Sequence, residues 1–160
     1  MELVNGAESY IGQGITDDAL VALGRQGRLC ARTLDFSNNK LGDDSAVMLA
    51  AMESLSCLYL CGNRISTRGA IALASSVSLT ALSLSNNVLD DDAAEHLSNS
   101  TSISTLFLVG NRIGNRGAMA LARSMSLREL VLDGNLIGDE GAVALSEIVS
   151  ELNRIVGGAA

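Results

Sequence analysis

Residues 55–65 read LSCLYLCGNRI, and the same pattern of side chains returns through most of the chain. It is LTALSLSNNVL over residues 79–89, ISTLFLVGNRI over 103–113 and LRELVLDGNLI over 127–137, with a more divergent copy, ARTLDFSNNKL, from Ala31. Counted at its asparagine, the pattern recurs every 24 residues without an insertion, at Asn39, Asn63, Asn87, Asn111 and Asn135. A fixed period of this length indicates a solenoid in which each coil repeats the same local fold.

Each unit predicts a short strand, a bend and a short helix. Leu58 and Leu60 alternate with outward positions, as in a strand that buries one face. An asparagine side chain has both donors and an acceptor, so in the bend it can satisfy backbone groups that stacking buries. We therefore expect the five asparagines to form an internal ladder. After the bend, GAIALA places Ala70, Leu73 and Ala74 on one face of a helix small enough for close packing of coils.

The unbroken phase predicts five coils over residues 31–150 in a single domain, 1–160. Their strands should form one parallel sheet and are expected to be centred on Asp35, Tyr59, Ser83, Phe107 and Val131.

The two ends of the chain depart from the repeat. Residues 1–30 hold a degenerate first unit, in which Ile15, Leu20 and Leu23 take apolar positions of the later coils. Terminal repeats are usually atypical because one of their faces meets water. Residues 143–156 predict a C-terminal capping helix, and the GGAA that follows resembles a linker, which favours a fragment of a longer protein.

Composition limits the possible partners and compartments. Apolar residues make up 48% of the 160 residues and aromatic residues only 2%, so the core must be aliphatic. A net charge of −7 argues against nucleic acid and anionic membrane surfaces as partners. No apolar run approaches the ~18 residues of a membrane span, and the stretch MELVNGAESY lacks the basic start and apolar run of a secretory signal. Three cysteines, an odd number, fit a reducing compartment such as the cytoplasm.

The repeat resembles the leucine-rich repeat family, in its ribonuclease-inhibitor-like subclass. The 24-residue unit with G-A-x-A-L-A is similar to the GALA-type repeats of bacterial effector proteins. The resemblance implies an α/β fold, a right-handed β/α superhelix with a curved parallel sheet on its concave face. It also implies a non-enzymatic protein–protein interaction module without a cofactor or small-molecule substrate. A bacterial effector of this kind would be delivered into a host cell.

We define the concave face as the outward strand positions and the outward position that follows each strand. Tyr59 and Phe107, two of the chain's four aromatic residues, both fall on it, with Ser83 between them. Large rings contribute strongly to protein interfaces, so we predict that these two anchor a protein partner. Acidic residues at the ends of the face favour a partner with basic groups there. The predicted partner-binding set is Tyr59, Phe107, Ser83, Asp35, Val131, Cys61, Val109, Glu129 and Asp133.

No catalytic or metal site is predicted. The single histidine, His96, falls on a helix without a nucleophile nearby, and Cys57 and Cys61 are too far apart along a strand to form a disulfide. The acidic pairs lack the converging oxygens of a Ca²⁺ site. Charges of alternating sign at 24-residue steps instead predict an inter-coil charge column: Asp44, Arg68, Asp92, Arg116 and Glu140.

Two other functions remain open on the same fold. The chain can be the recognition arm of a larger effector enzyme or of a ubiquitin-ligase adaptor. Alternatively it is an enzyme inhibitor or a GTPase-activating protein, for which Arg64 and Arg112, next to the ladder asparagines, are the candidate residues.

Overall fold

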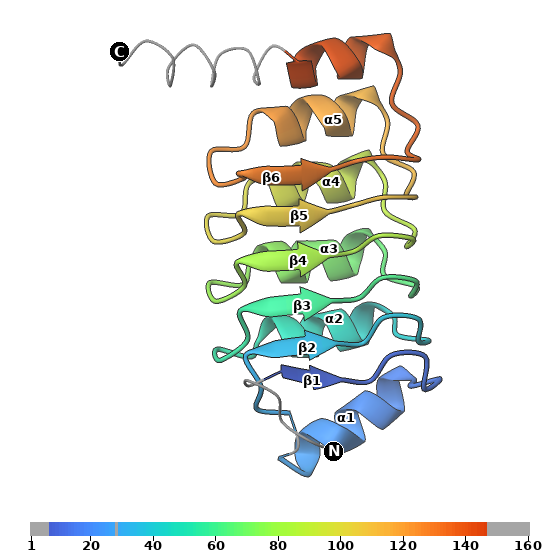
Figure 1. The fold of residues 1–160 in the computed structure, drawn as a ribbon, viewed down its shortest axis with the longest axis vertical. Helices are drawn as coiled ribbons and strands as arrows, with labels where there is room; N and C mark the ends of the chain where they lie inside the picture. The colour runs from blue at the N-terminus through green and yellow to red at the C-terminus, as the bar shows by residue number, and fades with distance from the viewer. Residues whose placement is uncertain (1–6, 28, 147–160) are drawn as a thin grey trace.

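The structure is a computed structural model that describes residues 7–27 and 29–146. Strands stack along one side of the molecule and short helices along the other, so that each coil contributes one of each (Figure 1). The elements are β1 (Ala7–Ser9), α1 (Asp17–Arg25), β2 (Thr33–Asp35), α2 (Asp43–Ala50), β3 (Cys57–Tyr59), α3 (Thr67–Ala74), β4 (Ala81–Ser83), α4 (Asp91–Ser98), β5 (Thr105–Phe107), α5 (Asn115–Ala122) and β6 (Glu129–Val131).

All six strands form one parallel sheet in sequence order, β1 to β6. From β2 onward each residue pairs with the residue 24 positions later, for example Tyr59 with Ser83 and Ser83 with Phe107. The predicted α/β solenoid is therefore confirmed. The strands are shorter than expected, and they end at the residues predicted as their centres. The central residues of β2 to β6 are the inward leucines Leu34, Leu58, Leu82, Leu106 and Leu130. The strands end one residue later because the backbone then turns into the bend.

The core is a stack of aliphatic layers with one aromatic pair near its N-terminal end. Leucines such as Leu58 and Leu82 are almost completely buried. Tyr10 and Phe36 stack in the core with their ring centroids 4.8 Å apart. Glu8 is buried at the strand position where the later coils carry leucine. The Tyr10 hydroxyl donates to its carboxylate at 2.9 Å, so this buried charge has a partner. Two of the four aromatic side chains are thus internal, and the other two lie on the concave face.

A ladder of asparagine side chains runs through the bends after the strands. The Nδ2 of Asn87 donates to the backbone carbonyls of Leu60, Leu84 and Ser85, while its Oδ1 accepts from the Ile65 amide at 2.9 Å. Asn39, Asn63, Asn111 and Asn135 make the corresponding bonds in their own coils. Each asparagine therefore closes its own bend and also fastens the coil before it.

The helix starts carry a second ladder. Asp43, at the first position of α2, accepts from the amides of Ser66 and Gly69 at the start of α3. Asp91 does the same for Gly114 and Gly117 at the start of α5. A carboxylate near these amides also complements the positive end of the helix dipole. Asp43 and Asp91 therefore fasten the start of the next helix to their own coil.

Successive coils are matched in pairs at the turn after the strand. Asn38, Gly62, Asn86 and Gly110 all have a positive φ, between 54° and 67°. A Cβ on Gly62 would collide with the Asn38 side chain, and one on Gly110 would collide with Asn86. The side chains of Asn38 and Asn86 thus occupy the space that a side chain at Gly62 or Gly110 would need. This contact explains why asparagine and glycine alternate at this position in these four coils.

The predicted charge column follows the same pairing. Arg68 forms ion pairs with Asp44 and with Asp43, and Arg116 with Asp92, Asp91 and Glu95. The predicted inter-coil pairs Asp44–Arg68 and Asp92–Arg116 are therefore present, whereas within the described residues no ion pair joins Arg68 to Asp92 or Arg116 to Glu140. Each arginine is paired with aspartates of the coil before it: Arg68 also lies 3.7 Å from Asp43, and Arg116 lies 3.9 Å from Asp91. Side chains this exposed contribute little to stability.

Asp90 gives the fold a testable pH dependence. Its carboxylate caps α4 by accepting from the Ala93 amide at 3.1 Å, and this bond lowers the pKa of Asp90. Because folding lowers the pKa, the stabilisation is complete above about pH 4 and is lost as the pH falls through the folded-state value. At neutral pH, Asp90→Ala should lower the free energy of unfolding by about 1 kcal/mol. Asp90→Asn should cost only a few tenths, because asparagine also accepts at a helix start.

Urea unfolding at neutral pH and near pH 3 measures this effect. The wild type should lose more stability on acidification than the Asp90→Asn variant, which keeps an acceptor but cannot titrate at this position. Equal losses in the two proteins would mean that Asp90 does not act as an ionised cap.

The C-terminal end is described only in part. Helical residues run from 139 to 146, whereas residues 147–156 of the predicted capping helix lie outside the described residues. None of the helices in the described part of the chain has the length and apolar character needed to cross a lipid bilayer.

Candidate functional site

Parallel pairing brings the predicted aromatic anchors onto one side of the sheet. The register joins Asp35 to Tyr59, Tyr59 to Ser83, Ser83 to Phe107 and Phe107 to Val131. Strands in a sheet lie about 4.8 Å apart, so Tyr59 and Phe107, two strands apart, are separated by roughly 10 Å. The inward phase belongs to Leu58, Leu82 and Leu106, which leaves this column on the side away from the helices.

Exposure along the column differs from the expectation. Tyr59 is 37% exposed, but Phe107 is half-buried and Ser83 is only 7% exposed. A serine between two rings on a closely spaced sheet is covered by its larger neighbours. Phe107 is therefore an outward ring that is less accessible than Tyr59.

The Ser83 hydroxyl has no hydrogen-bond partner among the described residues. Ser85, two positions later, is also 7% exposed, but its Oγ accepts from the Val109 amide at 3.2 Å. The Ser85 hydroxyl therefore stabilises the fold, whereas the Ser83 hydroxyl has a donor and an acceptor that remain unused between the two rings.

The column after the strands is less polar at its centre than at its ends. Cys61 and Val109 are half-buried beside Ser85, and Cys61 Sγ accepts a long contact of 3.6 Å from Asn86 Nδ2. Both cysteines of this face, Cys57 and Cys61, are free thiols, as is Cys30. Together with the two rings, these side chains form a partly apolar centre.

Acidic residues flank the centre of the concave face, on β2 at one side and on and after β6 at the other. Asp35 is half-buried, and its Oδ1 accepts from the Ser37 amide at 2.9 Å. Glu129 and Asp133 are exposed in the last described coil, next to the half-buried Val131. All nine predicted residues thus belong to one continuous surface, but they differ in how far they are accessible.

The described residues contain no cluster of three or more histidine, cysteine or acidic side chains that could hold a metal ion. His96 is exposed on α4, on the opposite side of the molecule from the strands.

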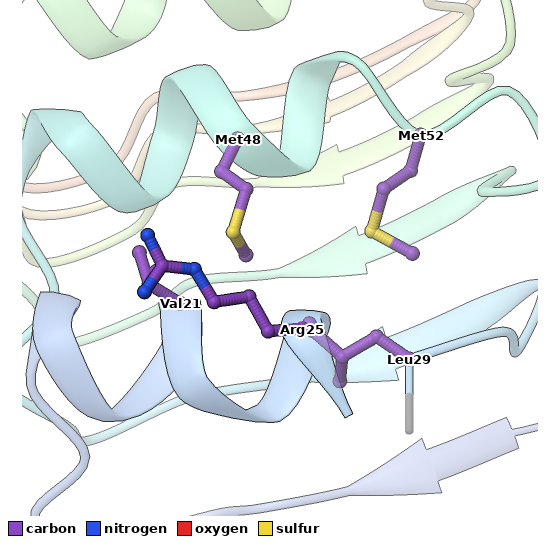
Figure 2. Close-up of a pocket in the computed structure, with 6 residues that line it drawn as sticks. Val21, Arg25, Leu29, Met48 and Met52 are labelled. Carbon is purple, nitrogen blue, oxygen red and sulfur yellow. The ribbon is translucent and has the colours of Figure 1, made fainter. Parts of the chain in front are cut away.

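A pocket of about 480 Å³ lies on the helical side, between α1 and α2 (Figure 2). Met48 and Met52 extend from α2 and the loop after it toward α1, and Arg25 lies across the opening. The corresponding positions of the next coil hold Ala72 and Ser76. The two flexible methionines thus fill space beside the tilted α1, and the pocket lacks the converging polar groups of a ligand site.

Repeated β/α coils with an internal polar ladder and a variable outward face define a class of solenoid scaffold. Two leucine-rich repeat family models match the chain, one over residues 53–113 and the other over residues 32–50 and 123–146. The chain therefore has the leucine-rich repeat solenoid fold. Such domains are generally protein-interaction modules, the fold is typically non-catalytic, and no enzyme family was detected.

Solved structures show the same fold. An internalin from Listeria monocytogenes is 27% identical with a TM-score of 0.59, covering 78% of this chain and 35% of that chain. This chain therefore spans about a third of the internalin chain. Actin-binding site 2 of leiomodin-1 is 12% identical with a TM-score of 0.54, covering 93% of this chain and 83% of that chain. No curated protein matched the sequence.

Sequence reasoning missed two features of the surface. The burial of Ser83 and Ser85 depends on the size of their neighbours across the sheet, which a pattern within one strand does not show. The second missed feature is Lys40, which, like Arg64 and Arg112, directly follows a ladder asparagine. Aligning the units on that asparagine is the signal that would have found it.

Proposed function

We propose that the chain binds a protein partner on its concave face, with Tyr59 and Phe107 as anchors on either side of Ser83. The observation that carries this proposal is the register that sets the two rings two strands apart with a buried serine between them. The core is aliphatic apart from Tyr10 and Phe36, so the outward rings of Tyr59 and Phe107 are not needed to fill it.

The centre of the face suits a small apolar group of the partner. Such a group can enter between the rings, above Ser83, and bury apolar surface on both. The unpaired Ser83 hydroxyl can bond a backbone or side-chain polar group that this contact removes from water. Cys61 and Val109 extend the apolar area in the neighbouring column.

Charge adds orientation at the two ends of the face. Asp35 lies on β2, one strand from the N-terminal edge of the sheet, and Glu129 and Asp133 lie in the last described coil. We propose that basic groups of the partner approach these ends, which would raise the association rate more than the final affinity.

Within the family, we propose the ribonuclease-inhibitor-like subclass with GALA-type repeats, because all but one of the units keep 24 residues and three of them carry G-A-x-A-L. A bacterial effector-like protein that recognises a target for a larger enzyme is compatible with the same face. The free thiols favour a reducing compartment, the cytoplasm or, for an effector, the host cell.

Photo-crosslinking tests which face binds. The photoreactive residue p-benzoylphenylalanine replaces Val109 on the concave face in one protein and His96 on α4 in a matched control. After expression in the native cells and illumination, a protein adduct should form from position 109 and not from position 96. Adducts from position 96 alone, or equal adducts from both, would reject the concave face as the binding site.

A further inference from the structure

A column of cations borders the concave face at the bend after each strand. The position that follows each ladder asparagine holds, coil by coil, Lys40, Arg64, Val88, Arg112 and Leu136. We call this column the turn edge. Its asparagine and leucine or isoleucine neighbours point inward, and its own side chains are exposed: Val88 is 40% and Leu136 70% exposed.

Backbone bonds alone hold the turn edge in place. The amide of Arg64 donates to the Leu41 carbonyl at 2.9 Å, and the amide of Arg112 donates to the Leu89 carbonyl at 2.8 Å. The amide of Lys40 donates to Ile15 in the same way. The fold therefore needs no particular side chain here, and the leucine and valine in the same column show that it tolerates apolar ones.

The three cations are unpaired in an acidic protein. Arg68 and Arg116 on the helical side are neutralised by aspartates, whereas in residues 7–27 and 29–146 no ion pair includes Lys40, Arg64 or Arg112. The whole chain carries a net charge of −7. The turn edge is thus a local positive strip on a negative molecule, immediately beside the proposed binding face.

We propose that the turn edge binds an acidic, extended segment of the protein partner whose apolar group sits between Tyr59 and Phe107. The proposal rests on the proposed function. Coils lie about 5 Å apart at this side, so Lys40 and Arg64 are roughly 5 Å apart and Arg112 about 10 Å further on. An extended peptide rises about 3.3 Å per residue and presents every second side chain to one side.

Side chains on one side of such a segment recur about every 6.6 Å, against roughly 5 Å between coils, and the long lysine and arginine side chains bridge the difference. An extended segment running along the stack can therefore place two carboxylates within reach of Lys40 and Arg64. It then presents an apolar side chain at Val88 and a third carboxylate at Arg112. The exposed Val88 interrupts the cations at the level of Ser83, the level at which the partner's apolar group would enter between the rings. This charge pattern favours an acidic polypeptide over an evenly charged polyanion such as nucleic acid.

Selection from a displayed library of random dodecapeptides tests the proposal without knowledge of the partner. The wild-type protein is compared with the variant Lys40→Gln, Arg64→Gln, Arg112→Gln. A matched control, Arg25→Gln, Arg123→Gln, Arg128→Gln, removes the same charge from exposed positions elsewhere. Wild type and control should enrich acidic peptides that contain an apolar residue. The turn-edge variant should bind the best of them about tenfold more weakly in fluorescence anisotropy, with less dependence on salt.

Several outcomes overturn the proposal: no enriched peptide, a neutral or basic pool from the wild type, or equal binding by the turn-edge variant. The double variant Tyr59→Ala, Phe107→Ala separates the two proposals. The aromatic anchors are rejected if this double variant selects acidic peptides with the same affinity and apolar content as the wild type does, while the turn-edge variant loses binding. If the double variant loses binding while the turn-edge variant does not, only the turn edge is rejected.

Discussion

Replacing Asn87 by alanine is expected to lower the free energy of unfolding by about 1–3 kcal/mol. Asn87 is 7% exposed, and its side chain makes four hydrogen bonds to the backbone of two coils. The loss is not four times that of a single bond. Leu60 and Leu84 each keep another ladder asparagine as donor, and Ser85 keeps the Gly62 amide. The Ile65 amide loses its acceptor in the core, and that orphaned group dominates the cost.

Two variants check this interpretation by denaturant titration. Asn135→Ala should cost less than Asn87→Ala, because Asn135 lies half-buried in the last described coil. Arg68→Ala should cost least, since its side chain is 63% exposed and its ion pairs lie at the surface. A larger loss from Arg68→Ala than from Asn87→Ala would show that the surface charges, and not the internal ladder, fasten the coils.

The sequence was sufficient to predict the architecture because the period is enforced by buried groups. Leu58, Leu82 and Leu106 recur in phase because each fills the same layer of the core, and a slip of one residue would expose them. The asparagines recur because each coil buries the same backbone groups in its bend. Such constraints act on every coil alike, and so they are visible in a single sequence.

Contacts between unlike residues of neighbouring coils were less predictable. Asp91 accepts hydrogen bonds from the amides of Gly114 and Gly117 and so joins the start of α5 to the coil before it. A sequence pattern within a single coil does not suggest this contact. The pairing of Asn38 with Gly62 and of Asn86 with Gly110 likewise needs the actual distance between turns. Burial on the concave face depends on neighbours in the same way, which is why Phe107 and Ser83 lie deeper than expected.

Tyr59→Ala and Phe107→Ala are each expected to weaken binding of the crosslinked partner by more than about 1 kcal/mol. Both rings contact the same apolar group of the partner in our proposal, so their effects should not be additive, and the double variant should bind more weakly than either single variant. Isothermal titration with the purified partner measures the change. Ile71→Ala is the matched control, because Ile71 is 39% exposed on α3 and Tyr59 is 37% exposed on the concave face.

Thermal unfolding separates lost contacts from lost structure. Tyr59→Ala removes an exposed ring and should leave the melting temperature nearly unchanged. Phe107 is half-buried, so Phe107→Ala should lower it by a few degrees at most, while the aliphatic layer beneath it stays intact. Binding is therefore compared well below both transitions. If the double variant captures the partner as well as the wild type, the binding surface cannot be centred on these rings. The turn edge carrying Arg64 and Arg112 then becomes the next surface to test, because its exposed cations lie one bend away from the same strands.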